Sequence, residues 1–123
     1  MPDWQPNWED VRWDHGAARD ATSALRHAAD LLDRTAAERA RVAQEATEQW
    51  RGRYREEFGE HLDQMLARAR ELARECRDAL GAIAQASQRA SEEQMRRERE
   101  RERWRAEKKD EERENRRKQQ GTS

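Results

Sequence analysis

Apolar positions recur at helical spacing in two stretches of the chain, separated by a short polar segment. Small residues, mostly alanine, return every three or four positions from Ala18 to Ala46, within a helix expected over about residues 15–49, and larger ones do so from Phe58 to Ala90, within a helix expected to start soon after Gly52. This spacing places side chains on one face of an α-helix and predicts two amphipathic helices. The predicted inward sets are Ala18, Ala21, Leu25, Ala28, Leu32, Thr35, Val42, Ala46 and Trp50, and then Phe58, Leu62, Met65, Ala69, Leu72, Cys76, Ala79, Ile83, Ala86 and Ala90.

The segment between the two stretches contains the tripeptide Trp50-Arg51-Gly52. Glycine adopts the left-handed conformation that ends a helix and turns the chain. The preceding tryptophan is large enough to pack such a turn in place. Asp14, just before the first stretch, is a residue type that caps helix N-termini. We therefore predict an all-α fold in which residues 15–90 form an antiparallel helical hairpin.

The apolar stripe of the second helix is wider than one partner helix covers. Leu66, Ala73 and Leu80 extend it beyond the narrow seam of a two-stranded coiled coil. We expect the hairpin to dimerise into a four-helix bundle, with another copy or with a related hairpin. The seam residues of the hairpin or dimer are predicted to be Leu25, Leu32, Leu62, Met65, Leu72, Cys76 and Ile83. Cys76 is interpreted as a small buried thiol, or as one half of a disulfide across the dimer axis.

Residues 1–14 are expected to form an extended arm, because both prolines of the chain lie there. The arm carries Trp4, Trp8 and Trp13. Two interpretations are open: these tryptophans cover the end of the bundle, or they form a hook that binds a partner.

Residues 91–123 are a charged tail, predicted to be partly helical or disordered. Pairs such as Glu93 with Arg97 have the order and spacing of helical ion pairs, but each contributes only a few tenths of a kcal/mol. We expect this helical extension to be frayed unless something binds it. Trp104 stands among charged residues and is interpreted either as an interface anchor or as a chance exposed side chain.

Composition narrows the classes of function. Charged residues make up 43% of the chain and apolar residues 33%, with a formal net charge of −1. Interleaved opposite charges give no field that recruits nucleic acid, and no stretch is apolar enough for membrane insertion. The first residues lack the basic and apolar regions of a signal peptide. No metal, cofactor or catalytic constellation is recognisable in the sequence, so we expect a non-enzymatic protein that needs no cofactor.

Trp50-Arg51-Gly52, followed by Phe58 six residues after the glycine, resembles the tip of the WXG family of early-secreted-antigen-like hairpin proteins. The resemblance covers residues 15–95 and implies a homodimer or heterodimer without enzymatic activity. It further implies type VII secretion, to the medium or the cell surface from a cytoplasmic pool, as a substrate or as a partner of a larger effector. Trp50 and Gly52 would contribute to recognition by the export machine, and Phe58 would pack behind them. The Arg- and Ala-rich composition is typical of high-GC actinobacterial genomes.

The chain departs from the family in one motif. Family members commonly carry Tyr-x3-Asp/Glu after the second helix, where this chain has Ser87 and Ser91. A partner would then have to supply that half of the signal. The alternative hypothesis is a cytoplasmic coiled-coil adaptor or structural protein unrelated to secretion. A continuous rod would separate Ala28 from Leu80 by tens of ångströms, whereas a hairpin brings them together.

Overall fold

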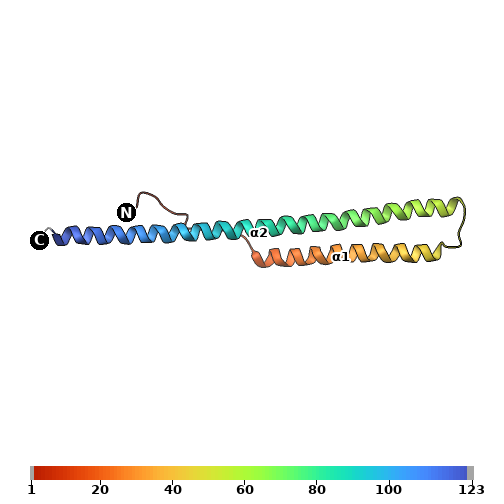
Figure 1. Ribbon diagram of the computed structural model, residues 1–123, viewed down its shortest axis with the longest axis horizontal. Coiled ribbons are helices and arrows are strands. Elements are labelled where there is room, and N and C mark those ends of the chain that lie inside the picture. Colours follow the sequence, from red (N-terminus) through yellow and green to blue (C-terminus); the bar gives the residue numbers. More distant parts are fainter. Residues whose placement is uncertain (1, 122–123) are drawn as a thin grey trace. The chain divides into compact units, whose positions relative to one another are not determined.

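The protein is an all-helical hairpin, as the apolar pattern predicts. The structure is a computed structural model that describes residues 2–121. It contains helix α1, His15–Ala46, and helix α2, Arg53–Gly121, which runs antiparallel to α1 over the first part of its length (Figure 1). The expected fold class is thereby confirmed.

The described chain divides into two compact units. The first, here called the hairpin unit, comprises residues 14–85: α1, the connection and the first half of α2. The second, here called the strap unit, comprises the arm, residues 2–13, and the rest of α2, residues 86–121. The two terminal segments, expected from the sequence as a separate arm of residues 1–14 and a separate tail of residues 91–123, thus belong to one unit.

Helix α1 begins and ends with side-chain caps. The Asp14 carboxylate accepts a hydrogen bond of 2.9 Å from the backbone N–H of Ala17, which satisfies one of the free donors of the first turn. At the other end, the buried Thr47 hydroxyl donates to the carbonyl of Ala43 at 2.7 Å, and the Thr47 N–H donates to the same carbonyl. The helix ends at Ala46, about three residues before the end that the apolar pattern predicts at residue 49.

The connection turns at the predicted glycine. Gly52 has a φ of 100°, in the region that side chains with a Cβ rarely adopt. Its carbonyl accepts from the N–H of Glu56 at 3.2 Å, which starts α2. Before it, the Trp50 N–H donates to the carbonyl of Thr47 at 3.0 Å, so the turn is closed by backbone bonds on both sides.

Alanines form the contact between the helices of the hairpin unit. Ala29 on α1 and Ala73 on α2 are both 0% exposed, and these small side chains let the helix backbones approach closely. Ala36 and Ala43 continue the α1 line at heptad spacing. The predicted inward set named Ala28, Thr35 and Val42 instead, one position earlier. The smallest residues face the partner helix, and larger neighbours such as Val42 are left at the edge.

Helix α2 continues to Gly121, so it includes residues 91–121 of the charged tail. The predicted ion pair of Glu93 with Arg97 is present at 3.0 Å, and the arm lies against this part of the helix (Figure 1). The contacts with the arm stabilise this part of α2 in addition to the weak ion pairs along the helix. Fraying was predicted from the weakness of those ion pairs alone. Within residues 2–121, neither helix combines the length and apolarity that crossing a membrane requires.

Candidate interaction surfaces

The hairpin tip is built around an aromatic pair. The Trp50 and Phe58 rings lie edge to face, with centroids 5.9 Å apart and an angle of 64° between their planes. Such edge-on packing is the favoured geometry of aromatic pairs. Both side chains stay substantially exposed. The structure therefore brings together two of the three residues assigned to the tip motif and places the third, Gly52, at the turn beside them.

An apolar groove extends from this tip between α1 and α2. Its volume is about 600 Å³, and its floor and walls are mainly aliphatic and aromatic. Val42 on α1 is 48% exposed and Met65 on α2 is 57% exposed. The groove is lined by Thr35, Glu38, Arg39, Val42, Ala43, Ala46, Phe58, His61, Leu62 and Met65.

The groove continues along the hairpin through two smaller hollows. One, of about 290 Å³, shares Leu62 and Met65 with the groove and adds the exposed Leu31. The other, of about 400 Å³, shares Met65 and reaches Leu72. We call this surface, from Trp50 and Phe58 to Leu31 and Leu72, the open face. Large exposed apolar surfaces of this kind mark sites of association.

Four of the predicted seam residues line the open face: Leu32, Leu62, Met65 and Leu72. Met65 is exposed there, as is Phe58 of the tip motif. The predicted seam residues other than Met65 are partly buried; they are Leu25, Leu32, Leu62, Leu72, Cys76 and Ile83. Leu66 and Ala73, assigned only to the flank of the stripe, are buried. The stripe is thus wider than α1 covers, which is the property from which dimerisation was predicted.

One polar contact links the helices of the hairpin unit away from the alanine seam. The Arg77 guanidinium lies 2.7 Å from the Asp33 carboxylate and 3.2 Å from that of Asp30. These two acceptors, Asp33 foremost, raise the pKa of Arg77. Arg77 thus connects α2 to two carboxylates that lie three positions apart on α1. Because these groups are solvated, they add little to stability and mainly fix which faces meet.

The arm forms the second surface, and its contacts are in the strap unit. Arm residues of increasing number meet α2 residues of decreasing number. The Trp4 indole N–H donates to Glu107 at 2.7 Å, and the Trp13 indole N–H donates to the Ser87 hydroxyl at 3.0 Å. Nine extended residues and twenty helical residues both span about 30 Å, so an extended arm matches this stretch of helix. Trp4 and Trp13 of the arm thus contact α2 within the strap unit, which neither interpretation of the sequence had proposed.

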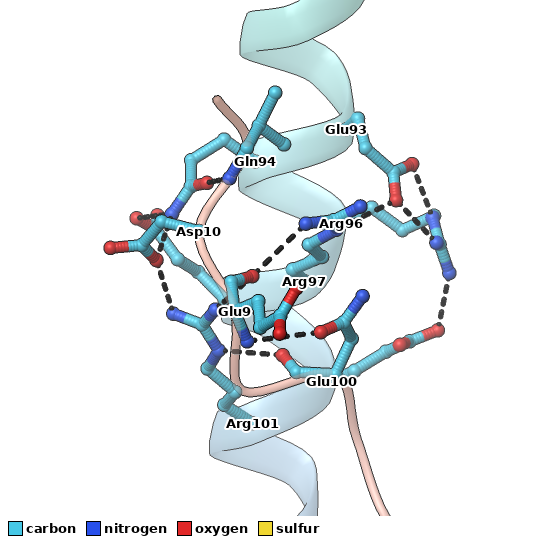
Figure 2. A network of polar contacts seen from close by, with 11 residues as sticks. Glu9, Asp10, Glu93, Gln94, Arg96, Arg97, Glu100 and Arg101 are labelled. Carbon is cyan, nitrogen blue, oxygen red and sulfur yellow. Dashed lines mark hydrogen bonds and ion pairs between the residues drawn. The ribbon is translucent and has the colours of Figure 1, made fainter. Parts of the chain in front are cut away.

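Polar side chains of α2 bind the backbone of the arm. Gln94 accepts from the N–H of Val11 at 2.8 Å. Arg97 donates to the carbonyl of Glu9 at 3.0 Å, and Arg101 donates to the carbonyls of Glu9 and Asn7 at 2.8 and 2.9 Å. Figure 2 shows the Gln94, Arg97 and Arg101 side chains reaching from the helix to this part of the arm.

Two carboxylates of this network are held in their charged form. Hydrogen bonds from Gln94 and then from Arg101 lower the pKa of Asp10. Hydrogen bonds from Arg96 and then from Arg97 lower the pKa of Glu93 from 4.5 to about 2 (Figure 2). Donors that favour the ionised form have this effect on a carboxyl group. Arg97 donates hydrogen bonds both to the Glu93 carboxylate and to the backbone of the arm, so it links the surface of α2 to the arm.

Trp104 is the buried aromatic residue of the strap unit, at 9% exposure. The Trp8 ring meets it edge on, with centroids 5.4 Å apart and perpendicular planes. A cationic group lies over each of the rings of Trp4, Trp8 and Trp104. The groups are Arg103 over Trp4 at 4.7 Å, Arg105 over Trp8 at 5.5 Å and Lys108 over Trp104 at 5.3 Å. Exposed cation–π contacts of this kind each contribute roughly 0.5–1 kcal/mol.

Sequence reasoning missed the partnership between the two ends of the chain. Gln94, Arg97 and Arg101 sit in a run of charged and polar residues that looks like any solvated helix face. Trp104 was a usable signal, because burying the apolar surface of a large ring on a charged helix requires another segment to pack against it. The arm supplies the matching rings, since it contains three of the five tryptophans of the chain.

Comparisons with protein-family models, with curated proteins and with solved structures found no match for this chain. The fold itself defines the class of protein: a two-helix hairpin with an open apolar face, and a helical extension against which the N-terminal arm packs.

Proposed function

We propose that this chain is a non-enzymatic, WXG-like protein of type VII secretion, acting as a secreted substrate or as the dimeric partner of a larger effector. The observation that supports this proposal is the open face, whose apolar groove of about 600 Å³ is lined by Phe58 of the Trp50–Phe58 pair. A second helical hairpin, from another copy or a related chain, has the shape and apolar stripe to fill it.

The rim of the groove also suits a helical partner. Glu38 and Arg39 border it on α1, and His61 borders it on α2. Arg68 lies further along α2 at the edge of the adjoining hollow. A rim with both signs of charge around an apolar centre is the usual composition of a protein–protein interface. It sets the register of a partner helix rather than attracting a polyanion.

Association through the open face predicts that Met65→Asp abolishes dimerisation without unfolding the hairpin. Met65 is mostly exposed in the single chain, so only burial by a partner would desolvate the new carboxylate. Met95→Asp is the matched control, because Met95 lies on the same helix and is 54% exposed. Light scattering during gel filtration gives the mass, against 14.6 kDa for one chain, and far-UV circular dichroism gives the helix content.

For the homodimer, we expect a doubled mass for the wild type and for Met95→Asp, and a single-chain mass for Met65→Asp. A Met65→Asp variant that kept the doubled mass would show that the open face is not the interface. A wild-type chain that is helical but monomeric would restrict the proposal to a heterodimer.

Secretion is tested separately, by fractionating a bacterium that has a type VII export machine and a matched strain that lacks the machine's ATPase. We expect the tagged chain in the medium or at the cell surface only when the ATPase is present. We also expect Trp50→Ala to reduce export while leaving the helix content unchanged. Retention of the chain inside both strains, with or without a co-expressed partner, would favour the adaptor hypothesis, which the long charged part of α2 supports.

A further inference from the structure

The contact between the arm and α2 has the chemistry of peptide recognition. We call Gln94, Arg97, Arg101, Trp104 and Glu107 the peptide strip. Three of these residues bind the main chain of the arm: Gln94 at Val11, Arg97 at Glu9, and Arg101 at Glu9 and Asn7. Main-chain recognition of an extended segment gives affinity for many sequences, and side-chain sites add specificity.

The strip also has side-chain sites, which define the ligand. Trp104 packs against the ring of Trp8, and Glu107 accepts from the indole of Trp4. Asp10 is bound by Gln94 at 2.9 Å and by Arg101 at 2.9 Å. The ligand is therefore an extended segment with two tryptophans four residues apart and an acidic residue two positions after the second.

The fit between strip and arm leaves one polar group unused. The Trp104 indole N–H is buried and has no hydrogen-bond partner among the described residues. A buried donor without an acceptor disfavours the complex that contains it. The arm is therefore a good but incomplete occupant, and a ligand that supplies an acceptor at this point would bind better.

The arm itself is only partly covered. Trp8 is 46% exposed and Trp13 is 37% exposed, and the bonds to Glu9 and Asn7 lie at the surface. Segments held by a few exposed polar bonds open at low free-energy cost. The arm can thus leave the strip without disturbing the alanine seam, which lies in the other unit.

From these observations we infer that the peptide strip is a binding site for extended, tryptophan-containing acidic segments of partner proteins, and that the arm is its built-in competing occupant. The arm is tethered to the same chain, so its effective concentration at the strip is on the order of millimolar. A partner segment must outcompete it, which keeps the site closed to weak ligands.

The test uses the full-length chain and a fluorescent synthetic peptide of residues 2–13. In the double variant Trp4→Ala/Trp8→Ala, the arm loses its side-chain anchors while every residue of the strip is retained. Fluorescence anisotropy should show the peptide binding this variant at least about tenfold more tightly than the wild type, because the tethered arm no longer competes. A peptide of the same composition in scrambled order serves as the ligand control.

Substitutions on the variant background separate recognition from general charge attraction. Arg101→Ala should weaken peptide binding at least about tenfold, because it removes bonds to two carbonyls and to Asp10. Arg99→Ala, an exposed arginine of the same helix, should leave binding unchanged.

Three results would overturn the inference: no binding to the double variant, equal binding of the scrambled peptide, or equal losses from the two arginine substitutions. If the double variant loses helix content, adding the peptide should restore it, and failure to do so would also overturn the inference. The hairpin dimer and its export do not depend on this outcome, because Met65 and Trp50 belong to the other unit.

Discussion

The hairpin unit and the strap unit each contain a stretch of α2 with a second segment packed against it, but the contacts that hold the two segments together differ in their chemistry. In the hairpin unit the covered positions are alanines such as Ala29 and Ala73, and the contact is made by apolar surface at close range. In the strap unit Trp104 is the buried ring, and an extended segment is held by hydrogen bonds from Gln94, Arg97 and Arg101. Segments whose hydrogen bonds are solvent-exposed open at a lower free-energy cost than contacts between buried apolar surfaces.

The largest effect is expected from Ala73→Asp, which breaks the hairpin seam. Ala73 has no exposure, so the new carboxylate would be buried without a partner, at a cost of roughly 3–5 kcal/mol in the free energy of unfolding. Ala67→Asp makes the same change at an exposed position of the same helix and should cost about 0.5 kcal/mol through helix propensity. Urea unfolding followed by circular dichroism measures both, and equal losses would show that the alanine seam is not the core.

A smaller and local effect is expected from Trp104→Ala, which breaks the strap. Removing the ring that Trp8 contacts should weaken docking of the arm by about 2 kcal/mol. Hydrogen exchange at the Val11 amide, which is bonded to Gln94, should then quicken by roughly 30-fold. Exchange at the amides around Ala29 should not change. Faster exchange at both places would show that the two units unfold together and would remove the contrast between them.

The same contrast explains what the sequence could predict. The cap at Asp14, the turn at Gly52 and the two helices follow from local residue preferences and from apolar spacing. The seam was misplaced by one position near Val42, because spacing alone does not tell whether the smaller or the larger residue faces the partner helix. Close packing favours the alanines and leaves Val42, Phe58 and Met65 on the open face.

The strap could not be predicted in this way. Arg97 and Arg101 differ in no local property from the many other arginines of the tail, and their role depends on an arm about ninety residues away in sequence. Hydrogen bonds to backbone carbonyls leave no trace in the partner's residue types. Only the tryptophans, large rings at both ends of a polar chain, carried a signal of this contact.

The smallest effect is expected from acid, and it should distinguish the units once more. The pKa of Glu93 is lowered from 4.5 to about 2 by Arg96 and Arg97, and that of Asp10 is lowered by Gln94 and Arg101. A lowered pKa means that the charged form stabilises the fold. This contribution is complete above pH 4.5 and is lost as the pH falls through about 2. The strap unit should therefore weaken over that range, whereas Ala29 and Ala73 in the hairpin seam have nothing to titrate.

Carboxyl NMR should give Glu93 a midpoint near 2, and Glu93→Gln should flatten the acid response of the Trp4 and Trp13 indole signals. A Glu93 midpoint near 4.5 would mean that its bonds to Arg96 and Arg97 do not persist in solution, and the strap would then rest on Trp104 and the backbone bonds alone.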